Sequence, residues 1–278
     1  MPKGARPQPD LGQNFLVDEA SLIAEIGYAD VTTRDIVLEV GAGTGNLTER
    51  LAARAGRVVA IEYDRQFRAR LESIASANGN VTTVWGDALT VDLPPFTKVV
   101  ANLPYRVALP VIMRLLGQPF GTAVLIVQKD MAQKISADPG EPGYGRVSVT
   151  VQRLARAELL DVVPRSAFSP PPSVDSAMLR LTPVSYPFPV ASEEAFKHLL
   201  DNLFLRREEK LGDALPGLAG VTALLPGRLR AKQVSQLAPG EFGEVSRFLD
   251  SHKVRLPAVR NSAKRTAQAP QRSRRKTR

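Results

Sequence analysis

The sequence predicts an α/β fold in which a mostly parallel sheet carries helices on both faces, followed by a small helical domain. Between residues 35 and 128, short apolar runs alternate with segments of helical periodicity. Strands that are joined by helical crossovers form a parallel sheet. A glycine-rich turn follows the first strand, and later strands end in polar residues. Ligands bind beyond the carboxyl ends of strands in such folds, so we expect the functional site there.

Five strands and three helices are expected in this region. The strands are DIVLEV (35–40), RVVAIEY (57–63), NVTTVWGD (80–87), KVVANL (98–103) and TAVLIVQ (122–128). The helices are NLTERLAARA (46–55), DRQFRARLESIASA (64–77) and ALPVIMRLL (108–116). Two further runs, AELLDVV (157–163) and DSAMLRLTP (175–183), indicate an antiparallel hairpin that closes the edge of a mixed sheet.

The segment GRVSVTVQRL (145–154) is ambiguous, because Val147, Val149 and Val151 alternate as they would in a strand. After a proline-rich stretch that suggests a hinge, SEEAFKHLLDNLFLRREEKLGDAL (192–215) begins with a serine cap pattern and predicts an amphipathic helix. A second helix is expected at 238–252. We therefore expect a first domain at 1–185, a small helical domain at 191–258 and a disordered basic tail at 259–278.

Composition narrows the class of protein. The chain has 278 residues, 44% of them hydrophobic, and no cysteine, which excludes disulfides and thiolate metal sites. Its two histidines, His198 and His252, are far apart, so we expect no metal. The N-terminus has no apolar core of a signal peptide, and no run approaches the roughly 18 apolar residues of a membrane span. We expect a cytoplasmic protein without a membrane partner.

The charge points to a polyanionic partner. The net charge is +9, and the segment at 263–278 alone holds seven basic residues and no acid. Nucleic acid is favoured over a membrane surface because no amphipathic anchor is evident. A tail of this composition is also explained by solubility alone.

Glycines and acids follow the first three strands. Gly41, Gly43 and Gly45 form a turn where a ligand can approach the backbone at a helix N-terminus, although such turns also simply join a strand to a helix. Glu62 ends the second strand, where a carboxylate can accept both hydroxyls of a ribose. Asp87 ends the third, where it can accept from an adenine amino group. The alternatives are a surface glutamate and a cap for the residues after Asp87.

The spacing of the glycines is G-x-G-x-G and not the G-x-G-x-x-G of dinucleotide-binding folds. No second mononucleotide-binding half is evident, and an acid stands on each of the next two strands. This combination fits S-adenosylmethionine better than NAD. The sequence here resembles the class I methyltransferases, which implies a Rossmann-like, mostly parallel seven-stranded sheet.

The stretch NLPY (102–105) begins with a polar residue, Asn102, at the end of a predicted buried strand. A stranded amide costs roughly 1–3 kcal/mol, so Asn102 needs a partner. Its amide oxygen and the carbonyl of Leu103 can hold the two N–H bonds of an adenine or cytosine amino group and help the nitrogen become pyramidal. Pro104 fixes the turn, and Tyr105 can stack on an extruded base. No general base is required. An Asn-x-Pro turn with a core tyrosine is the structural alternative.

The wider sequence is similar to the ribosomal RNA adenine dimethyltransferases over about residues 10 to 255. Four stretches occur in the family order: GQNFLVD (12–18), EVGAGTGNLT (39–48), NLPY (102–105) and VPRSAFSPPPSVDSAMLRL (163–181). The segment at 128–149 looks closer to the archaeal branch. That family makes N6,N6-dimethyladenosine at two adjacent adenines near the 3′ end of small-subunit rRNA. The resemblance implies a monomeric enzyme of ribosome biogenesis that acts on small-subunit rRNA within a pre-ribosomal small subunit.

The resemblance also implies roles for particular residues. Tyr105, Leu103 and Asn102 would hold the target adenine at the NLPY turn that Pro104 shapes, and Phe168 would stack on its other face. Family members carry a helix at 147–151, which we prefer to the strand suggested by the valines. The family often has Asn or Gln where this chain has Arg106. The residues implied to bind S-adenosylmethionine are Asn14, Leu16, Gly41, Gly43, Glu62, Asp87 and Asn102.

Three alternatives share parts of this pattern. A large-subunit rRNA adenine methyltransferase of the antibiotic-resistance type has the same catalytic motifs, but LFLRREEKLGDAL (203–215) resembles the small-subunit enzymes. DNA adenine methyltransferases usually carry Asn/Asp-Pro-Pro-Tyr instead of NLPY. A non-catalytic RNA-binding assembly factor could keep the fold, but it would not need Glu62, Asp87 and NLPY together.

Overall fold

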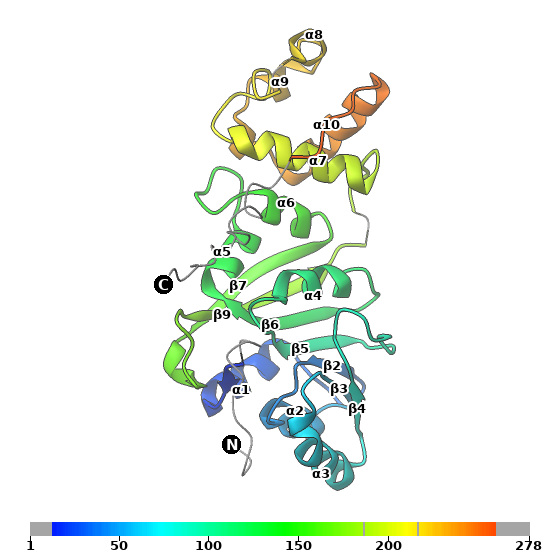
Figure 1. Ribbon diagram of the computed structural model, residues 1–278, viewed down its shortest axis with the longest axis vertical. Coiled ribbons are helices and arrows are strands. Elements are labelled where there is room, and N and C mark those ends of the chain that lie inside the picture. Colours follow the sequence, from blue (N-terminus) through cyan, green and yellow to red (C-terminus); the bar gives the residue numbers. More distant parts are fainter. Residues whose placement is uncertain (1–12, 186, 216, 260–278) are drawn as a thin grey trace, which may run out of the picture. The chain divides into compact units, whose positions relative to one another are not determined.

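Seven strands form one mixed sheet in the first part of the chain (Figure 1). The computed structural model describes residues 13–185, 187–215 and 217–259. The spatial order of the strands is β4-β3-β2-β5-β6-β9-β7, in which β2 to β6 are parallel and β9 runs antiparallel to both β6 and β7. The strands are β2 (Ile36–Val40), β3 (Arg57–Glu62), β4 (Val81–Trp85), β5 (Lys98–Asn102), β6 (Thr122–Gln128), β7 (Ala155–Val163) and β9 (Ser176–Pro183). The predicted strands and the antiparallel closing hairpin are confirmed.

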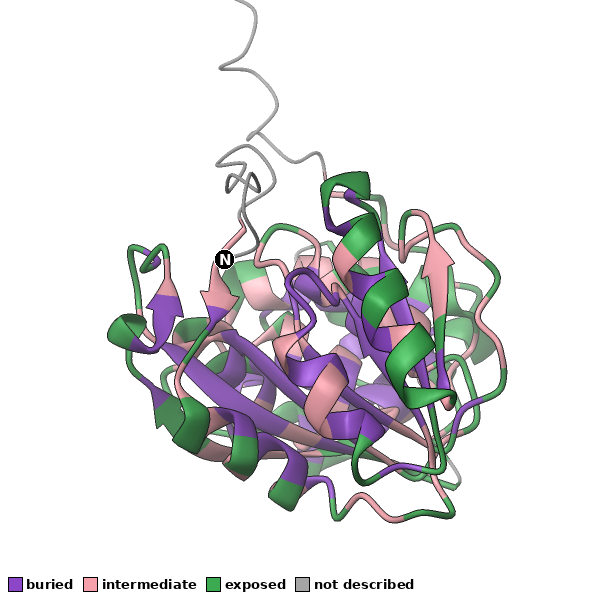
Figure 2. Cartoon of the chain, turned by 90° about the horizontal axis from the view of Figure 1, so that it is seen from below, coloured by how far each residue is buried: buried purple, intermediate pink, exposed green. Residues whose placement is uncertain are grey.

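Helices cover both faces of this sheet, and two hydrophobic clusters fill the spaces between them. Alternate strand residues enter different clusters: Val37 packs with α1, α2 and α3, whereas its neighbour Leu38 packs with α4, α5 and α6. In Figure 2 the strands are mostly purple and the outer surfaces of the helices are green. The helices are α1 (Glu19–Tyr28), α2 (Asn46–Ala52), α3 (Arg68–Asn78), α4 (Ala108–Leu115), α5 (Lys129–Ser136) and α6 (Arg146–Gln152).

The ambiguous segment at 145–154 is the helix α6, as the family resemblance implied, and the alternating valines do not form a strand. Val149 and Val151 are both fully buried because this short helix packs on α5 and on β7. The Ser148 hydroxyl accepts from the Gly145 N–H at 2.9 Å and donates to the Lys134 carbonyl. Burial on two sides therefore imitates the period of a strand.

A second, two-stranded sheet lies outside the main one. In it β1 (Phe15–Leu16) pairs antiparallel with β8 (Phe168–Ser169), so that Leu16 lies opposite Phe168. Strands of two residues are too short to show any periodicity, and the sequence did not predict them. The pairing joins two segments that are about 150 residues apart in the chain.

The described residues divide into two compact units, one up to Phe188 with Ala238–Gly240, and one from Pro189 to Leu237 with the residues from Glu241 onward. The described part of the second unit contains α7 (Glu193–Leu203), α8 (Ala219–Thr222), α9 (Gly227–Arg230) and most of α10 (Pro239–Ser251). The Ser192 hydroxyl accepts from the Ala195 N–H at 3.1 Å, so the predicted cap of α7 is confirmed. The predicted basic tail lies, apart from residue 259, outside the described residues.

The predicted helix at 192–215 is too long, because α7 ends at Leu203. A short 3₁₀ turn follows, and the next residues bind a later part of the same unit. The Leu211 N–H donates to the Lys232 carbonyl at 2.9 Å, and Lys210 forms a β-bridge with Gln233. These tertiary hydrogen bonds replace the helical ones. Within the described ranges, no helix is both long and apolar enough to cross a membrane.

Candidate active site

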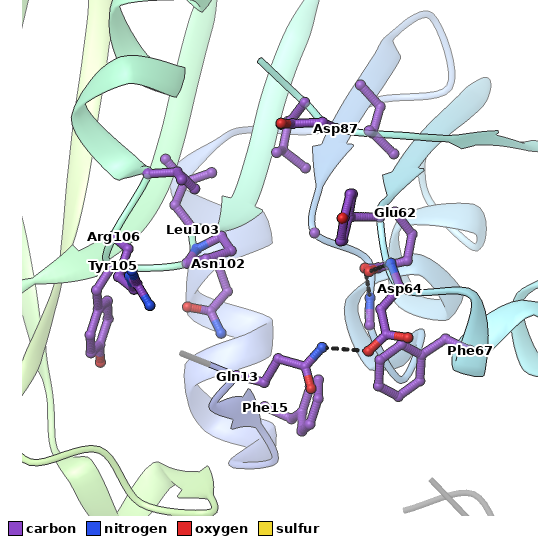
Figure 3. Close-up of a pocket in the computed structure, with 18 of the residues that line it drawn as sticks. Gln13, Phe15, Glu62, Asp64, Phe67, Asp87, Asn102, Leu103, Tyr105 and Arg106 are labelled. Carbon is purple, nitrogen blue, oxygen red and sulfur yellow. Dashed lines mark hydrogen bonds between the residues drawn. The ribbon is translucent and has the colours of Figure 1, made fainter. Parts of the chain in front are cut away.

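A cleft of about 410 Å³ opens at the carboxyl ends of the parallel strands. Four strands and one N-terminal segment supply its walls, as expected where parallel strands end at one edge of a sheet. Figure 3 shows the turn after β5 on one side, Glu62 and Asp64 on the other, and Gln13 and Phe15 between them. The polar lining includes Gln13, Asn14, Glu62, Asp64, Asp87, Asn102, Tyr105 and Arg106.

The glycine-rich turn after β2 brings Gly41 and Gly43 into the wall of the cleft. Both have positive φ, 79° and 51°, which glycine adopts without strain. A Cβ atom on Gly43 would lie 2.9 Å from the Phe15 ring, and one on Gly41 would lie 3.6 Å from the Pro104 side chain. Close packing against the protein itself therefore already requires glycine at position 43.

Glu62, the last residue of β3, is buried beside this turn with only 6% of its surface exposed. One carboxylate oxygen accepts from the Gly43 N–H at 2.8 Å and the other from the Asp64 N–H at 2.7 Å. Burial raises the pKa of Glu62, and hydrogen bonds from the backbone N–H groups of Asp64, Gly43 and Tyr63 oppose that rise. The carboxylate is held in one orientation, and a lone pair that these backbone donors do not use can accept from a ligand.

Asp87 follows β4 and is exposed at the rim of the same cleft. Its Oδ1 atom accepts from the Leu89 N–H at 2.8 Å, so the carboxylate caps the following turn. Within the described part of the chain this cap uses one of its two oxygens. The capping role and a role toward a ligand are therefore compatible.

The N-terminal segment that contains Gln13 crosses the cleft and is tied on both sides. The Gln13 amide donates to the Asp64 carboxylate at 2.8 Å (Figure 3), and the Asn102 amide donates to the Asn14 carbonyl at 3.1 Å. Leu16, by contrast, is 5% exposed and packs in the core, and it lines a smaller cavity next to the cleft. The structure thus places Asn14 in the cleft wall and Leu16 behind it.

The NLPY turn is held by hydrogen bonds at each end. The Leu103 N–H donates to the Ile126 carbonyl at 3.0 Å, which continues the pairing of β5 with β6, and the Pro104 carbonyl accepts from the Val107 N–H at 3.1 Å. The Tyr105 hydroxyl lies 2.6 Å from the Ser176 hydroxyl on β9. Burial raises the pKa of Tyr105, so the phenol is neutral at ordinary pH.

The bond from Asn102 to Asn14 decides how the Asn102 amide is oriented. Because Nδ2 donates to the Asn14 carbonyl, Oδ1 is the amide atom that is left as an acceptor. Figure 3 shows this oxygen on the side of Tyr105. An acceptor next to an aromatic ring is the arrangement expected for an amino group carried on a flat base.

Phe168 does not line the cleft. It lies in β8 opposite Leu16, is 3% exposed and belongs to the hydrophobic cluster on the α1–α3 face of the sheet. The structure brings the residues of the NLPY turn to the cleft but not Phe168. The stacking role of Phe168 therefore stays a prediction.

Several cleft residues were missed by sequence reasoning. Phe15 and Phe67 pack edge to face in the cleft wall, with ring centroids 5.3 Å apart, and Asp64 accepts from Gln13. Gln13 and Phe15 stand inside the quoted GQNFLVD motif, which could have indicated them. Asp64 also accepts from the Gln66 N–H at 3.0 Å and so begins a 3₁₀ turn, a local role that hides its place in the cleft.

The donor set suits an adenosyl ligand more than a metal. An anchored carboxylate, a second carboxylate at the rim and an apolar wall of Phe15, Phe67 and Leu103 fit a ribose, an amino group and a flat ring. In the described parts of the chain, no three His, Cys, Asp or Glu side chains gather in a group that could hold a metal ion.

Comparisons with known proteins agree with this arrangement. A family model described as "Ribosomal RNA adenine dimethylase" matches residues 4–248. A protein of Methanococcoides burtonii, named "Probable ribosomal RNA small subunit methyltransferase A", is 37% identical over 246 residues, which cover 85% of this chain and 91% of that protein. A protein of the same name from Halobacterium salinarum is 42% identical over 227 residues, covering 80% of this chain and 79% of that protein.

Two solved structures extend the comparison to the fold. A dimethyladenosine transferase from Plasmodium falciparum aligns with a TM-score of 0.76 and 26% identity, covering 87% of this chain and 99% of that chain. The 23S rRNA methyltransferase ErmE aligns with a TM-score of 0.67 and 27% identity, covering 85% and 100%. The seven-stranded sheet is that of the class I methyltransferases, and the chain is a methyltransferase that belongs to the ribosomal RNA adenine dimethylase family.

Proposed function

We propose that this protein methylates the N6 amino groups of two adjacent adenosines near the 3′ end of small-subunit rRNA, within a pre-ribosomal small subunit. The observation that carries the proposal is the Asn102 amide, which lines the cleft and whose nitrogen donates to the Asn14 carbonyl, so that its oxygen is left as an acceptor. The same cleft holds an anchored carboxylate, Glu62, at the end of β3, which is separated from β5 by β2. An acceptor for an amino group and a site for a ribose are the two needs of this reaction.

S-adenosylmethionine, when bound, supplies an activated methyl group on a sulfonium. Glu62 accepts hydrogen bonds from the ribose hydroxyls with the lone pairs that Gly43 and Asp64 do not use. Asp87 accepts from the adenine amino group at the rim. Asn14 and Gly41 complete the cleft wall. Leu16 supports this wall from behind rather than from within the cleft.

The target amino group is a poor nucleophile because its lone pair is delocalised into the ring. Asn102 Oδ1 and the Leu103 carbonyl accept hydrogen bonds from its two N–H groups. These bonds favour a pyramidal nitrogen, whose lone pair can attack the methyl group. As the N–C bond formed, the methyl–sulfur bond would break and the sulfonium would become a neutral thioether. The positively charged nitrogen would then release its proton to water, so no side chain is needed as a general base. Tyr105, anchored through its hydroxyl to Ser176, presents its ring to the base.

RNA binding is the second part of the proposal. The helical unit carries Arg206, Arg207 and Lys210. Arg206 pairs with Glu209 and Arg207 with Glu208, and in both pairs the carboxylate partner is well exposed. Exposed ion pairs contribute about 0–1 kcal/mol, so a phosphate can replace the carboxylate at little cost. We propose a monomer in the cytoplasm, where ribosomal subunits assemble.

The test is to incubate the protein with methyl-labelled S-adenosylmethionine and small subunits from a strain that lacks the modification. Label on two adjacent adenosines near the 3′ end of the rRNA is the expected result. Large subunits are tested in parallel, because ErmE shares the fold and its name specifies 23S rRNA. Label confined to large subunits would favour the antibiotic-resistance type of enzyme, and tight binding without label would favour an assembly factor.

A further inference from the structure

Glu25 is a carboxyl group in the interior of the protein that the proposed reaction does not use. It lies on α1, none of its surface is exposed, and its helix neighbours Leu22 and Ile26 are core residues. Neither of its carboxylate oxygens meets a hydrogen-bond partner among the described residues. Buried polar groups are almost always hydrogen-bonded, to protein or to ordered water, so this side chain calls for a partner.

A second buried carboxyl lies beside it. Glu39, on β2, is 2% exposed, and its Oε2 atom accepts from the Thr48 hydroxyl at 2.6 Å. Burial raises the pKa of Glu39 to about 8. Burial, with a smaller contribution from Glu39, also raises the pKa of Glu25 well above its usual range. Glu39 is therefore mostly protonated at neutral pH, and burial favours the neutral form of Glu25 as well, so that such groups can donate as well as accept.

The charges around the pair do not change this conclusion. Glu62 on β3 is the next acid along, and it too favours a neutral Glu39. Two cations of the surrounding elements are engaged with other carboxylates: Arg50 on α2 pairs with Glu19, and Arg180 on β9 pairs with Glu158.

A cavity of about 30 Å³ is lined by both carboxyl groups. That volume exceeds the roughly 10–15 Å³ that a site needs to hold one water molecule. Thr44 and Asn46 add polar groups to its wall, so a water molecule there would find the two to four partners that buried waters have. The cavity also has Phe15, Gly41 and Asn102 in common with the large cleft, so the two share a wall.

We propose that this pocket is an ordered-water site, in which Glu25 and Glu39 hold one water molecule next to Asn102 and so make Glu25 a positioning residue for the Asn102 amide. The water would satisfy the oxygens of Glu25 and the second oxygen of Glu39, and would fill the space on the side of Asn102 away from the substrate. Its presence does not depend on the proposed function, whereas its effect on methyl transfer does.

The direct test is a crystal structure of the full chain at a resolution that shows ordered water. One solvent peak within hydrogen-bond distance of both carboxyl groups is expected in the wild type, and none in Glu25→Leu, where the apolar side chain fills the space. A dry cavity in the wild type, or a peak with the coordination of a metal cation, would overturn the proposal.

Single-turnover methyl transfer and calorimetric binding of S-adenosylmethionine test the role of the water. Glu25→Gln, which can still bind it, should keep the wild-type rate, as should Glu19→Gln, an exposed change on the same helix. Glu25→Leu should lose roughly tenfold in rate, because small displacements of a reacting group are costly, with the affinity for S-adenosylmethionine unchanged. A wild-type rate in Glu25→Leu, or equal losses of rate and affinity, would contradict positioning. A wild type that transfers no methyl would instead count against the proposed function.

A third measurement, the melting temperature as a function of pH, tests the proposal even if Glu25→Leu does not fold. A carboxyl whose folded pKa is raised loses stability as pH rises above the pKa of the unfolded chain, and glutamine does not. The melting temperature of Glu25→Gln should therefore gain on that of the wild type as pH rises above 4.5, the ordinary pKa of glutamate. A difference that is constant with pH would show that Glu25 is not held as a neutral acid.

Discussion

The amide nitrogen of Asn102 donates to the Asn14 carbonyl, and its oxygen is the proposed acceptor for the target amino group. A single substitution can test this role. Asn102→Ala should lower single-turnover methyl transfer by about 100-fold or more, the loss seen when one preorganised polar group is removed from a reaction site. Asn78→Ala is the matched control, since that amide donates to the Ile74 carbonyl on α3. Transfer by Asn102→Ala at nearly the wild-type rate would refute the proposed use of its oxygen.

Glu62 is the residue expected to hold the ribose. Glu62→Gln keeps the shape of the side chain but removes the charge, and loss of a charged hydrogen-bond partner costs about 1.5–3 kcal/mol. Calorimetry should show S-adenosylmethionine binding weakened by that amount. Glu72→Gln, an exposed change on α3 where the glutamate pairs with Arg68, should bind as the wild type does. Equal affinities for both variants would remove Glu62 from the binding site.

Glu39 makes a prediction about pH. Its pKa is raised from the ordinary 4.5 to about 8, so the folded state keeps a proton that the unfolded chain releases. The free energy of unfolding then falls as pH rises through this window, by at most about 1.4 kcal/mol per pH unit for one such group. Glu39→Gln should flatten the decline of the melting temperature between those pH values. A wild-type and a variant curve that run parallel would contradict the raised pKa.

The same three residues show what a sequence reveals at this scale. Asn102 and Glu62 could be predicted as site residues because they end strands whose carboxyl ends meet at one edge. Glu39 stands one residue before the end of β2, in the motif EVGAGTGNLT. Nothing in the sequence indicated that it lies near Glu25, another buried acid, on α1. Contacts between side chains from different elements depend on the packing of those elements, which periodicity does not describe.

At the scale of elements, Phe168 is a buried residue of β8, which pairs with β1. Its contribution to stability can therefore be tested separately from its predicted stacking on the target base. Its burial predicts that Phe168→Ala costs about 3–5 kcal/mol of stability, whatever it does in catalysis. Phe168→Leu keeps most of the volume at a cost below about 1.5 kcal/mol but removes the aromatic face. If the ring stacks on the target base, Phe168→Leu should melt nearly as the wild type does while single-turnover transfer stays slow.

Recovery of both stability and transfer in Phe168→Leu would make the ring a core residue only. Tyr105→Phe serves as the control, because it removes the hydroxyl that lies near Ser176 and keeps the aromatic face.

Elements were predictable where local pattern and tertiary packing agree. TAVLIVQ is a run of apolar and β-branched residues, and β6 occupies the same seven positions, 122–128. The pattern failed where packing is not one-sided: α6 is buried on two sides, and the chain after α7 turns back to pair with residues near 233 instead of continuing as a helix. The two-residue strands β1 and β8 had no pattern to read.

At the scale of the whole molecule, the net charge of +9 determines the last prediction. Most of the affinity for a structured rRNA should come from phosphate contacts, and each neutralised phosphate adds about 0.7–0.9 to the slope of log affinity against log salt. Deletion of residues 263–278, which carry seven basic side chains, should therefore weaken binding to small subunits and flatten that slope. A deletion variant with an unchanged slope would make the tail a solubility device.

Phosphate contacts carry no sequence information, so the same deletion should leave the modified adenosines unchanged. The matched comparison is Arg206→Gln with Lys210→Gln in the full chain, which removes two cations from the helical unit and should lower the slope by about 1.4–1.8 if both contact phosphate. Mapping the label in each variant then separates RNA affinity from the choice of the adenosine that is modified. If either variant methylates a different adenosine, the basic residues read the RNA sequence themselves, and specificity does not reside in the cleft and the docking of the chain alone.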